Sequence, residues 1–148
     1  MPTYYPPVGF HFRVSFQLEE AGDADTRFQE VSGLGQELNT EELVEGGELR
    51  FAHQLPVGTR HGNLVCKRGL LPDSGLVRWV RDALEEFTFT PTTVVVTLLN
   101  EKHEPLTGWH FSNVYPVKWT IGNLNAMDNS IVVETLELAY QSQTPAVT

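Results

Sequence analysis

The chain has 148 residues, the length of one domain that can bury a sizeable core without disulfides or metals. Its net charge of −9 argues against duplex nucleic acid or an anionic membrane as the main partner, because both require clustered Lys and Arg. The single cysteine excludes an intramolecular disulfide, and no apolar run is long enough to cross a bilayer. The first residues lack the basic and apolar regions of a signal peptide, so we expect synthesis in the cytoplasm.

Apolar and polar residues alternate strictly from Val8 to Leu18, after an extended lead-in over residues 1–7 that contains three prolines. Alternation with a period of two predicts a strand with one apolar and one polar face. The polar face carries His11, Arg13, Ser15 and Gln17. A turn then leads to a second predicted strand over Arg27–Leu34, which we expect to pair with the first as a hairpin.

The segment 36–49 holds five glutamates, no basic residue and the pair Gly46-Gly47. This composition predicts a long acidic loop or a projecting arm, and loops of this length in compact domains are usually functional or disordered. A solvated loop is the alternative to a docking arm, and both interpretations stay open. The residues that we expect to make contacts if the arm docks are Glu37, Leu38, Glu41, Glu42, Leu43, Val44, Glu45 and Glu48.

Two shorter strand candidates follow, in residues 49–56 and 62–71, and then a helix. Asp73 or Ser74 is a suitable N-cap for this helix. Its apolar residues recur at helical spacing and predict one buried face; they are Leu76, Trp79, Val80, Ala83, Leu84 and Phe87.

The last part of the chain predicts three strands. Residues 92–100 are apolar on both faces, a hairpin loop follows over 101–105, and the returning strand covers 106–119. We expect the alternating apolar residues of this strand to share one face; they are Trp109, Phe111, Tyr115, Val117 and Trp119. The final strand covers 130–140, and the polar segment 141–148 is expected to be a frayed tail.

The irregular segment between these last two strands carries three apolar residues, Ile121, Leu124 and Met127, where a loop normally carries polar ones. Packing against another subunit is one explanation. The alternative is that the three side chains tuck over the end of a barrel.

No arrangement of residues indicates a chemical site. The five histidines have no metal-binding spacing, although His11 and His110 lie on the polar sides of their strands, where a sheet could bring them together. Cys66 lies in a predicted strand and is interpreted as core or interface. Gly33 and Gly35 indicate a bulge or a close backbone approach rather than a phosphate loop, because no helix follows them. We expect no enzyme activity, no metal and no cofactor.

These elements predict one mainly β domain over residues 1–148, an antiparallel barrel or sandwich with one flanking helix. The order of segments resembles the T4-type tail tube proteins of contractile phage tails and extracellular contractile injection systems. The resemblance covers roughly Tyr5 to Tyr140. It rests on FHFRVSF, RFQEVSGLGQE, GNLVCKRGLL, the helix LVRWVRDALEEF, TVVVTLLNEKHEPLTGWHFSNVYPVKW and VVETLELAYQS, in this order.

The resemblance implies six-fold rings whose sheets join into one continuous barrel around a lumen, with the rings stacked into a tube. It implies as partners further copies of the chain, a sheath protein, baseplate or spike and cap proteins, and lumen cargo such as a protein effector or DNA. We expect no stable nucleic-acid binding and no membrane insertion by the chain itself. The long loop of the family, which reaches the adjacent ring, corresponds to Gln36–Leu49, and the polar face of the first strand would line the lumen or the outer wall.

Several alternatives stay open on the sequence. A tube-initiator paralogue at the baseplate side is the alternative to the main tube subunit. The particle is a phage tail, a bacteriocin-like particle or an injection system that is released from the cell. From other classes, the chain is a monomeric β-barrel that binds a small ligand, or a hydrolase that uses Cys66 or a histidine.

Overall fold

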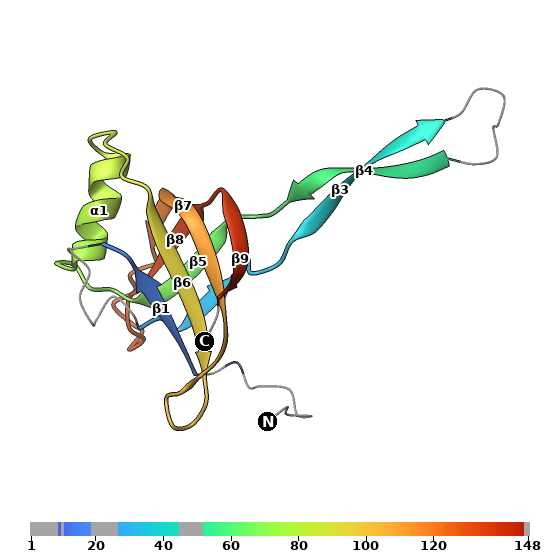
Figure 1. Ribbon diagram of the computed structural model, residues 1–148. Helices are drawn as coiled ribbons and strands as arrows, with labels where there is room; N and C mark the ends of the chain where they lie inside the picture. Colours follow the sequence, from blue (N-terminus) through green and yellow to red (C-terminus); the bar gives the residue numbers. More distant parts are fainter. Residues whose placement is uncertain (1–8, 10, 19–26, 45–51, 147–148) are drawn as a thin grey trace.

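A computed structural model describes residues 9, 11–18, 27–44 and 52–146 of the chain. The described strands are β1 (Phe12–Phe16), β2 (Glu30–Ser32), β3 (Glu37–Val44), β4 (Ala52–Arg60), β5 (Leu64–Gly69), β6 (Thr92–Leu99), β7 (Pro105–Ile121), β8 (Val133–Ala139) and β9 (Ser142–Ala146). The helix α1 (Gly75–Leu84) lies on one side of the sheet body, and the β3–β4 hairpin projects from the other side (Figure 1).

The body is one antiparallel sheet in the order β1-β6-β7-β8-β5-β2, and β9 pairs with β7. The 17-residue strand β7 connects the two halves of this sheet. Its first part pairs with β6 and β9, and its second part, from Tyr115 to Ile121, pairs with β8. The predicted mainly antiparallel fold with one helix is therefore confirmed.

The core is one cluster to which both the strands and α1 contribute. Its strand residues include Val14, Leu64, Val94, Phe111 and Leu138, all of which are fully buried. From the helix, Leu76, Trp79 and Val80 pack into the same cluster, and the rings of Phe16 and Trp79 lie 6.1 Å apart. Burial of this apolar face is the main free-energy gain that holds α1 on the sheet.

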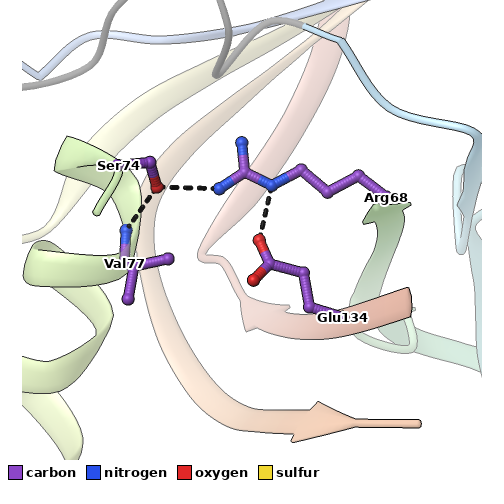
Figure 2. Close-up of polar contacts among 4 residues, drawn as sticks. All are labelled: Arg68, Ser74, Val77 and Glu134. Atoms are coloured by element: carbon purple, nitrogen blue, oxygen red, sulfur yellow. Dashed lines mark hydrogen bonds and ion pairs between the residues drawn. The ribbon is translucent and has the colours of Figure 1, made fainter. Parts of the chain in front are cut away.

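A buried polar group fixes the start of the helix (Figure 2). Ser74 is the N-cap, and its hydroxyl accepts a hydrogen bond from the Val77 N–H at 3.1 Å. The same hydroxyl accepts a bond of 2.8 Å from Arg68 of β5, whose Nε lies 2.5 Å from Glu134 Oε1 of β8. The side chains of Arg68 and Glu134 are almost completely buried, so this pair joins the helix to two strands away from solvent.

The expected hairpin between the first two strands is wrong. β1 pairs with β6, with Val14 opposite Val96 and Phe16 opposite Val94, whereas β2 pairs with β5. The physical reason is burial. The long apolar β6 places Val14 and Phe16 of β1 in the core, whereas β2 is a three-residue strand that offers little apolar surface.

The expected shared face on β7 is also wrong. Phe111 is fully buried, but Tyr115 and Val117 are exposed, and the buried residues after the break are Val114 and Pro116. Between Phe111 and Val114 the ladder with β6 shifts by one residue, and Asn113 has a φ of 51°. This bulge exchanges the two faces of the strand, so the alternation read from the sequence does not continue through it.

The expected frayed tail is wrong for most of its length, because Ser142–Ala146 forms β9 on the edge of β7. The polar side chains of β9 bury little apolar surface, but its backbone pairs with the backbone groups along the edge of β7. Gly108 permits this close approach, since a Cβ there would lie 3.1 Å from Ala146 Cβ and 2.9 Å from the carbonyl oxygen of Val96. The predicted lead-in over residues 1–7 lies outside the described residues.

Candidate assembly surfaces

The predicted acidic loop is an ordered arm in the residues that the structure describes. β3 and β4 form a two-stranded antiparallel sheet of their own, in register from Glu37 opposite Arg60 to Val44 opposite Ala52. A register shift after Asn39 adds one irregularity. The arm extends away from the body (Figure 1). An isolated two-stranded hairpin is at best marginally stable in water, so this geometry favours a second surface against which the arm packs.

The residues expected to make contacts lie on the arm as far as they are described. Glu37, Leu38 and Glu41 are exposed, and Leu38 exposes 54% of its surface. The backbone of Glu42, Leu43 and Val44 belongs to β3, and Glu45 and Glu48 lie outside the described residues. The arm therefore carries both carboxylates and an unburied apolar side chain, a combination suited to a partner surface with basic groups.

The apolar segment between β7 and β8 is a second exposed surface. Ile121, Leu124 and Met127 expose 45%, 78% and 93% of their surfaces, and Ile131 exposes 66%. The alternative that these side chains tuck over the barrel end is wrong. Local bonds shape the segment: the Met127 N–H donates to Asn125 Oδ1, and the Ser130 N–H donates to Asp128 Oδ1. The bonds from Ser130 also hold the pKa of Asp128 below its usual value.

An aromatic cluster that the sequence analysis missed lies at the end of α1. The rings of Phe87 and Phe89 are 5.0 Å apart, and Phe89 lies 6.1 Å from Tyr115 of β7. Phe87 was expected on the buried helix face, but the helix ends at Leu84 and Phe87 is 81% exposed. Phe87 has a φ of 57°, and the next N–H, of Thr88, donates to the Asp82 carbonyl at 2.8 Å, so a residue in the left-handed region follows the helix as in many helix ends. A glycine at position 87 would have indicated the end of the helix in the sequence, because glycine is the residue most often found in this conformation after a helix. A phenylalanine gives no such indication.

The polar face of the first strand is where the sequence placed it. Arg13 and Gln17 are exposed, His11 and Ser15 are half-buried, and Val14 and Phe16 point to the core. His11 does not meet His110, because β6 lies between β1 and β7. Its ring instead contacts that of His103 in the β6–β7 loop, with centroids 4.5 Å apart.

The described residues offer no arrangement for catalysis at Cys66. Cys66 is fully buried in β5, and burial raises the pKa of its thiol to about 12, against a smaller opposing effect of Arg68. The reactive thiolate is therefore not formed near neutral pH. Within the same described ranges, no group of three or more His, Cys, Asp or Glu residues is placed to hold a metal ion. In that part of the chain, α1 is too short and too polar to span a membrane.

Large apolar side chains fill much of the interior of the body. Phe111, Leu64 and Leu138 are among the largest fully buried side chains. A hollow of about 800 Å³ lies at the surface, where residues 27–29 and 68–71 meet residues 130–132. A packed β body with one helix, exposed apolar surfaces and a projecting arm is typical of proteins that assemble with further copies or partners.

Comparison with known proteins identifies the class. Residues 8–144 match the family of the T4-like virus tail tube protein gp19, and the chain belongs to this family. It is therefore a structural protein of the tail tube type. No curated protein sequence matches the chain.

Solved structures share the fold. A chain of the anti-feeding prophage (AFP) baseplate, determined with six-fold symmetry, has 34% sequence identity and a TM-score of 0.87, with 97% of both chains covered. A chain of the PVC sheath–tube complex, an extracellular contractile injection system in its extended state, has 24% identity and a TM-score of 0.80 over 98% of this chain and 94% of that one. Hcp1 from Flavobacterium johnsoniae has 14% identity and a TM-score of 0.53 over 92% and 94% of the two chains.

Proposed function

We propose that this protein is the inner tube subunit of a contractile injection system or phage-like tail, in which hexameric rings stack into a tube. The observation that carries the proposal is membership of the family of the T4-like virus tail tube protein gp19 over residues 8–144. The 34% identity to a chain of the six-fold symmetric AFP baseplate supports the ring, and the fold shared with a chain of the PVC sheath–tube complex supports the tube. In this function the protein is a conduit and a rigid rod, not an enzyme.

Contacts between rings are assigned to the acidic arm. The exposed Glu37, Leu38 and Glu41 on β3, together with the remaining arm residues up to Glu48, would meet basic and apolar groups on the adjacent ring. This assignment gives the two-stranded sheet the additional packing surface that such a hairpin requires. Because exposed charges contribute, the contact should weaken as salt screens them.

Contacts within a ring are assigned to the sheet edges and the apolar segment. β1 and β2 end the path of the body sheet, and edge strands with open backbone groups are natural sites of pairing with another chain. Neighbouring subunits would also cover Ile121, Leu124 and Met127, which are exposed in the single chain. In such a ring, His11, Arg13, Ser15 and Gln17 face either the lumen or the outer wall.

The remaining partners follow from the same function. A sheath protein would surround the tube, baseplate or spike and cap proteins would bind its ends, and a protein effector or DNA would occupy the lumen. The net charge of −9 suits a conduit that does not retain nucleic acid. The particle would be assembled in the cell and released as part of a tail-like assembly.

A tube-initiator subunit at the baseplate side is the second candidate. The observation in its favour is that the 34% identical chain comes from a baseplate structure, whereas the chain from the sheath–tube complex shares 24%. Both functions require the same six-fold ring and differ in whether the ring stacks on further copies of itself.

Negative-stain electron microscopy of the purified protein, combined with mass from light scattering, tests the proposal. Stacked rings with a central channel are the expected result for the tube subunit. Single hexameric rings that do not stack would favour the initiator. A protein that remains a monodisperse monomer at every concentration and binds a small molecule would overturn both functions in favour of the ligand-binding class.

A further inference from the structure

The two ends of the arm meet the body at one place, the corner between β8 and β9. Residues 33–36 lead into β3, and residues 61–63 lead out of β4 into β5. Both segments contact Tyr140 or its neighbours on this corner. We refer to the group formed by Leu34, Gln36, His61, Asn63, Tyr140 and Gln143 as the arm root.

Gln143 holds the segment that enters β3. Its side-chain Nε2 donates to the Leu34 carbonyl at 2.6 Å, and its own carbonyl accepts from Gln36 Nε2 at 3.3 Å. Its side-chain Oε1 accepts from the Tyr140 hydroxyl at 3.2 Å. One residue of β9 therefore makes three bonds, two to the arm entry and one to the corner residue, and these bonds restrict its side chain.

Tyr140 holds the segment that leaves β4. The rings of His61 and Tyr140 are stacked, with centroids 3.8 Å apart and an angle of 8° between the planes. Asn63 Nδ2 adds a bond of 3.2 Å to Glu137 Oε1 of β8. Tyr140 is only 5% exposed and packs edge-on against Phe111 of the core at 4.7 Å, so the surface on which His61 lies is itself rigid.

The two segments also contact each other. Gly33 has a φ of +89°, and a Cβ at this position would collide with the carbonyl oxygen of Asn63. Only glycine adopts this conformation at such a close approach without strain. The close backbone approach expected from the glycines of residues 33–35 is thus confirmed at Gly33, whereas a Cβ at Gly35 would meet no atom within 4 Å.

We propose that the arm root is a fixed joint that sets the direction of the β3–β4 arm relative to the body, and that this direction determines whether the arm meets its site on another copy of the chain. An eight-residue strand such as β3 spans about 27 Å. A tilt of about 10° at the root would therefore displace the tip by about 5 Å, more than a specific side-chain contact tolerates. The second half of the proposal rests on the proposed function of the arm; the first half does not.

The joint is separable from the core that stabilises the body. Gln36 is exposed, and His61 and Gln143 are half-buried, so their replacement removes contacts of the arm root without opening a cavity in the core. They are positioning residues, and a readout of arm direction is required to distinguish this role from a general effect on stability.

The direct test is a distance measurement between spin labels on the arm and on the body. Thr40→Cys on β3 and Arg78→Cys on α1 place labels at exposed positions in the full chain, with Cys66 buried. Electron–electron double resonance is recorded below the assembly concentration, in the parent and in His61→Ala with Gln143→Ala. The matched control is Thr144→Ala, an exposed neighbour on β9. We expect a narrow distribution in the parent and the control, and a distribution at least twice as broad in the variant.

Assembly is then measured as the concentration at which half of the protein sediments as tubes or rings. We expect at least a tenfold increase for the double variant, less than a twofold change for Thr144→Ala, and an unchanged thermal midpoint of the body. Gln36→Ala removes a single bond of the arm root and provides a milder variant if the double variant folds poorly. We expect this variant to broaden the distance distribution to an intermediate extent.

The outcomes separate the two halves of the proposal. An unchanged distance distribution in both variants overturns the joint. A broadened distribution with unchanged assembly overturns the claim that arm direction controls the contact. If the parent chain does not assemble under any condition, the proposed function fails, while the distance measurement still decides whether the root is a fixed joint.

Discussion

The body and the arm of this protein use the same kind of secondary structure under different physical conditions. In β5 of the body, the side chains of Leu64 and Cys66 are fully buried in the core. In β3 of the arm, Leu38 leaves 54% of its surface in solvent, and within the described part of the chain the strand pairs with β4 alone. A buried core thus stabilises the body from within, whereas a two-stranded arm with an exposed apolar side chain has little packing of its own.

The largest effect on the stability of the body is expected from replacing Trp79, the large buried aromatic residue of α1. Trp79 is 4% exposed, packs near Phe16 and donates from Nε1 to the Thr90 carbonyl at 2.8 Å. We expect Trp79→Ala to reduce the free energy of unfolding by about 3–5 kcal/mol, measured by urea denaturation. Arg78→Ala, on the exposed side of the same helix turn, is the control. A loss similar to that of the control would contradict the packing of α1.

The buried ion pair gives the next largest expected effect. Glu134→Ala would remove the carboxylate that lies 2.5 Å from Nε of the Arg68 guanidinium, which is 2% exposed (Figure 2). We expect a loss of about 3 kcal/mol in the free energy of unfolding, at the lower end for a broken buried pair. Replacing both residues, Arg68→Met with Glu134→Leu, should cost less than Glu134→Ala alone. An equal loss of unfolding free energy in Glu134→Ala and in the double variant would contradict the view that the buried charge of Arg68 causes the loss once Glu134 is removed.

The arm should respond in the opposite manner, with a loss of assembly and little change in folding. Reversing the charge of Glu41, Glu42 and Glu45 to lysine should raise the concentration required for tube formation by at least tenfold. Because the side chain of Glu41 is exposed, the free energy of unfolding should change by less than about 0.5 kcal/mol. Sedimentation and electron microscopy measure the first effect, and urea denaturation the second. Tubes of unaltered length would count against an arm that connects rings.

The smallest expected change in stability concerns the aromatic cluster of Phe87, Phe89 and Tyr115. This cluster lies on the body, but its side chains are exposed. Phe87 has a φ of 57°, a conformation that glycine adopts more readily than phenylalanine. We expect Phe87→Gly to raise the free energy of unfolding by about 0.5–1 kcal/mol, and Phe87→Ala to give no such gain. A loss on Phe87→Gly would indicate that the contact with Phe89 outweighs the backbone strain.

The sequence predicted the elements that depend on local patterns. Alternation over Val8–Leu18 predicted the strand that becomes β1, and the helical spacing from Leu76 to Ala83 predicted α1 with Ser74 as one of two caps. The acidic composition of residues 36–49 predicted a loop or an arm, and the apolar Ile121, Leu124 and Met127 indicated an unusual loop. These features depend on periodicity and composition within a short window, which a single sequence contains.

The tertiary structure decided the features that depend on residues far apart in the chain. The partner of β1 is β6 because core burial outweighs the shorter connection to β2. The bulge at Asn113 exchanges the faces of β7, and β9 forms because β7 has an open edge. Likewise, the arm root unites residues near positions 34, 61 and 140, a meeting that no local pattern contains. The sequence by itself determined most of the segments that form strands and the helix, but not β9. Only the packed chain decided how the strands pair, because pairing is selected by the free energy of the whole core.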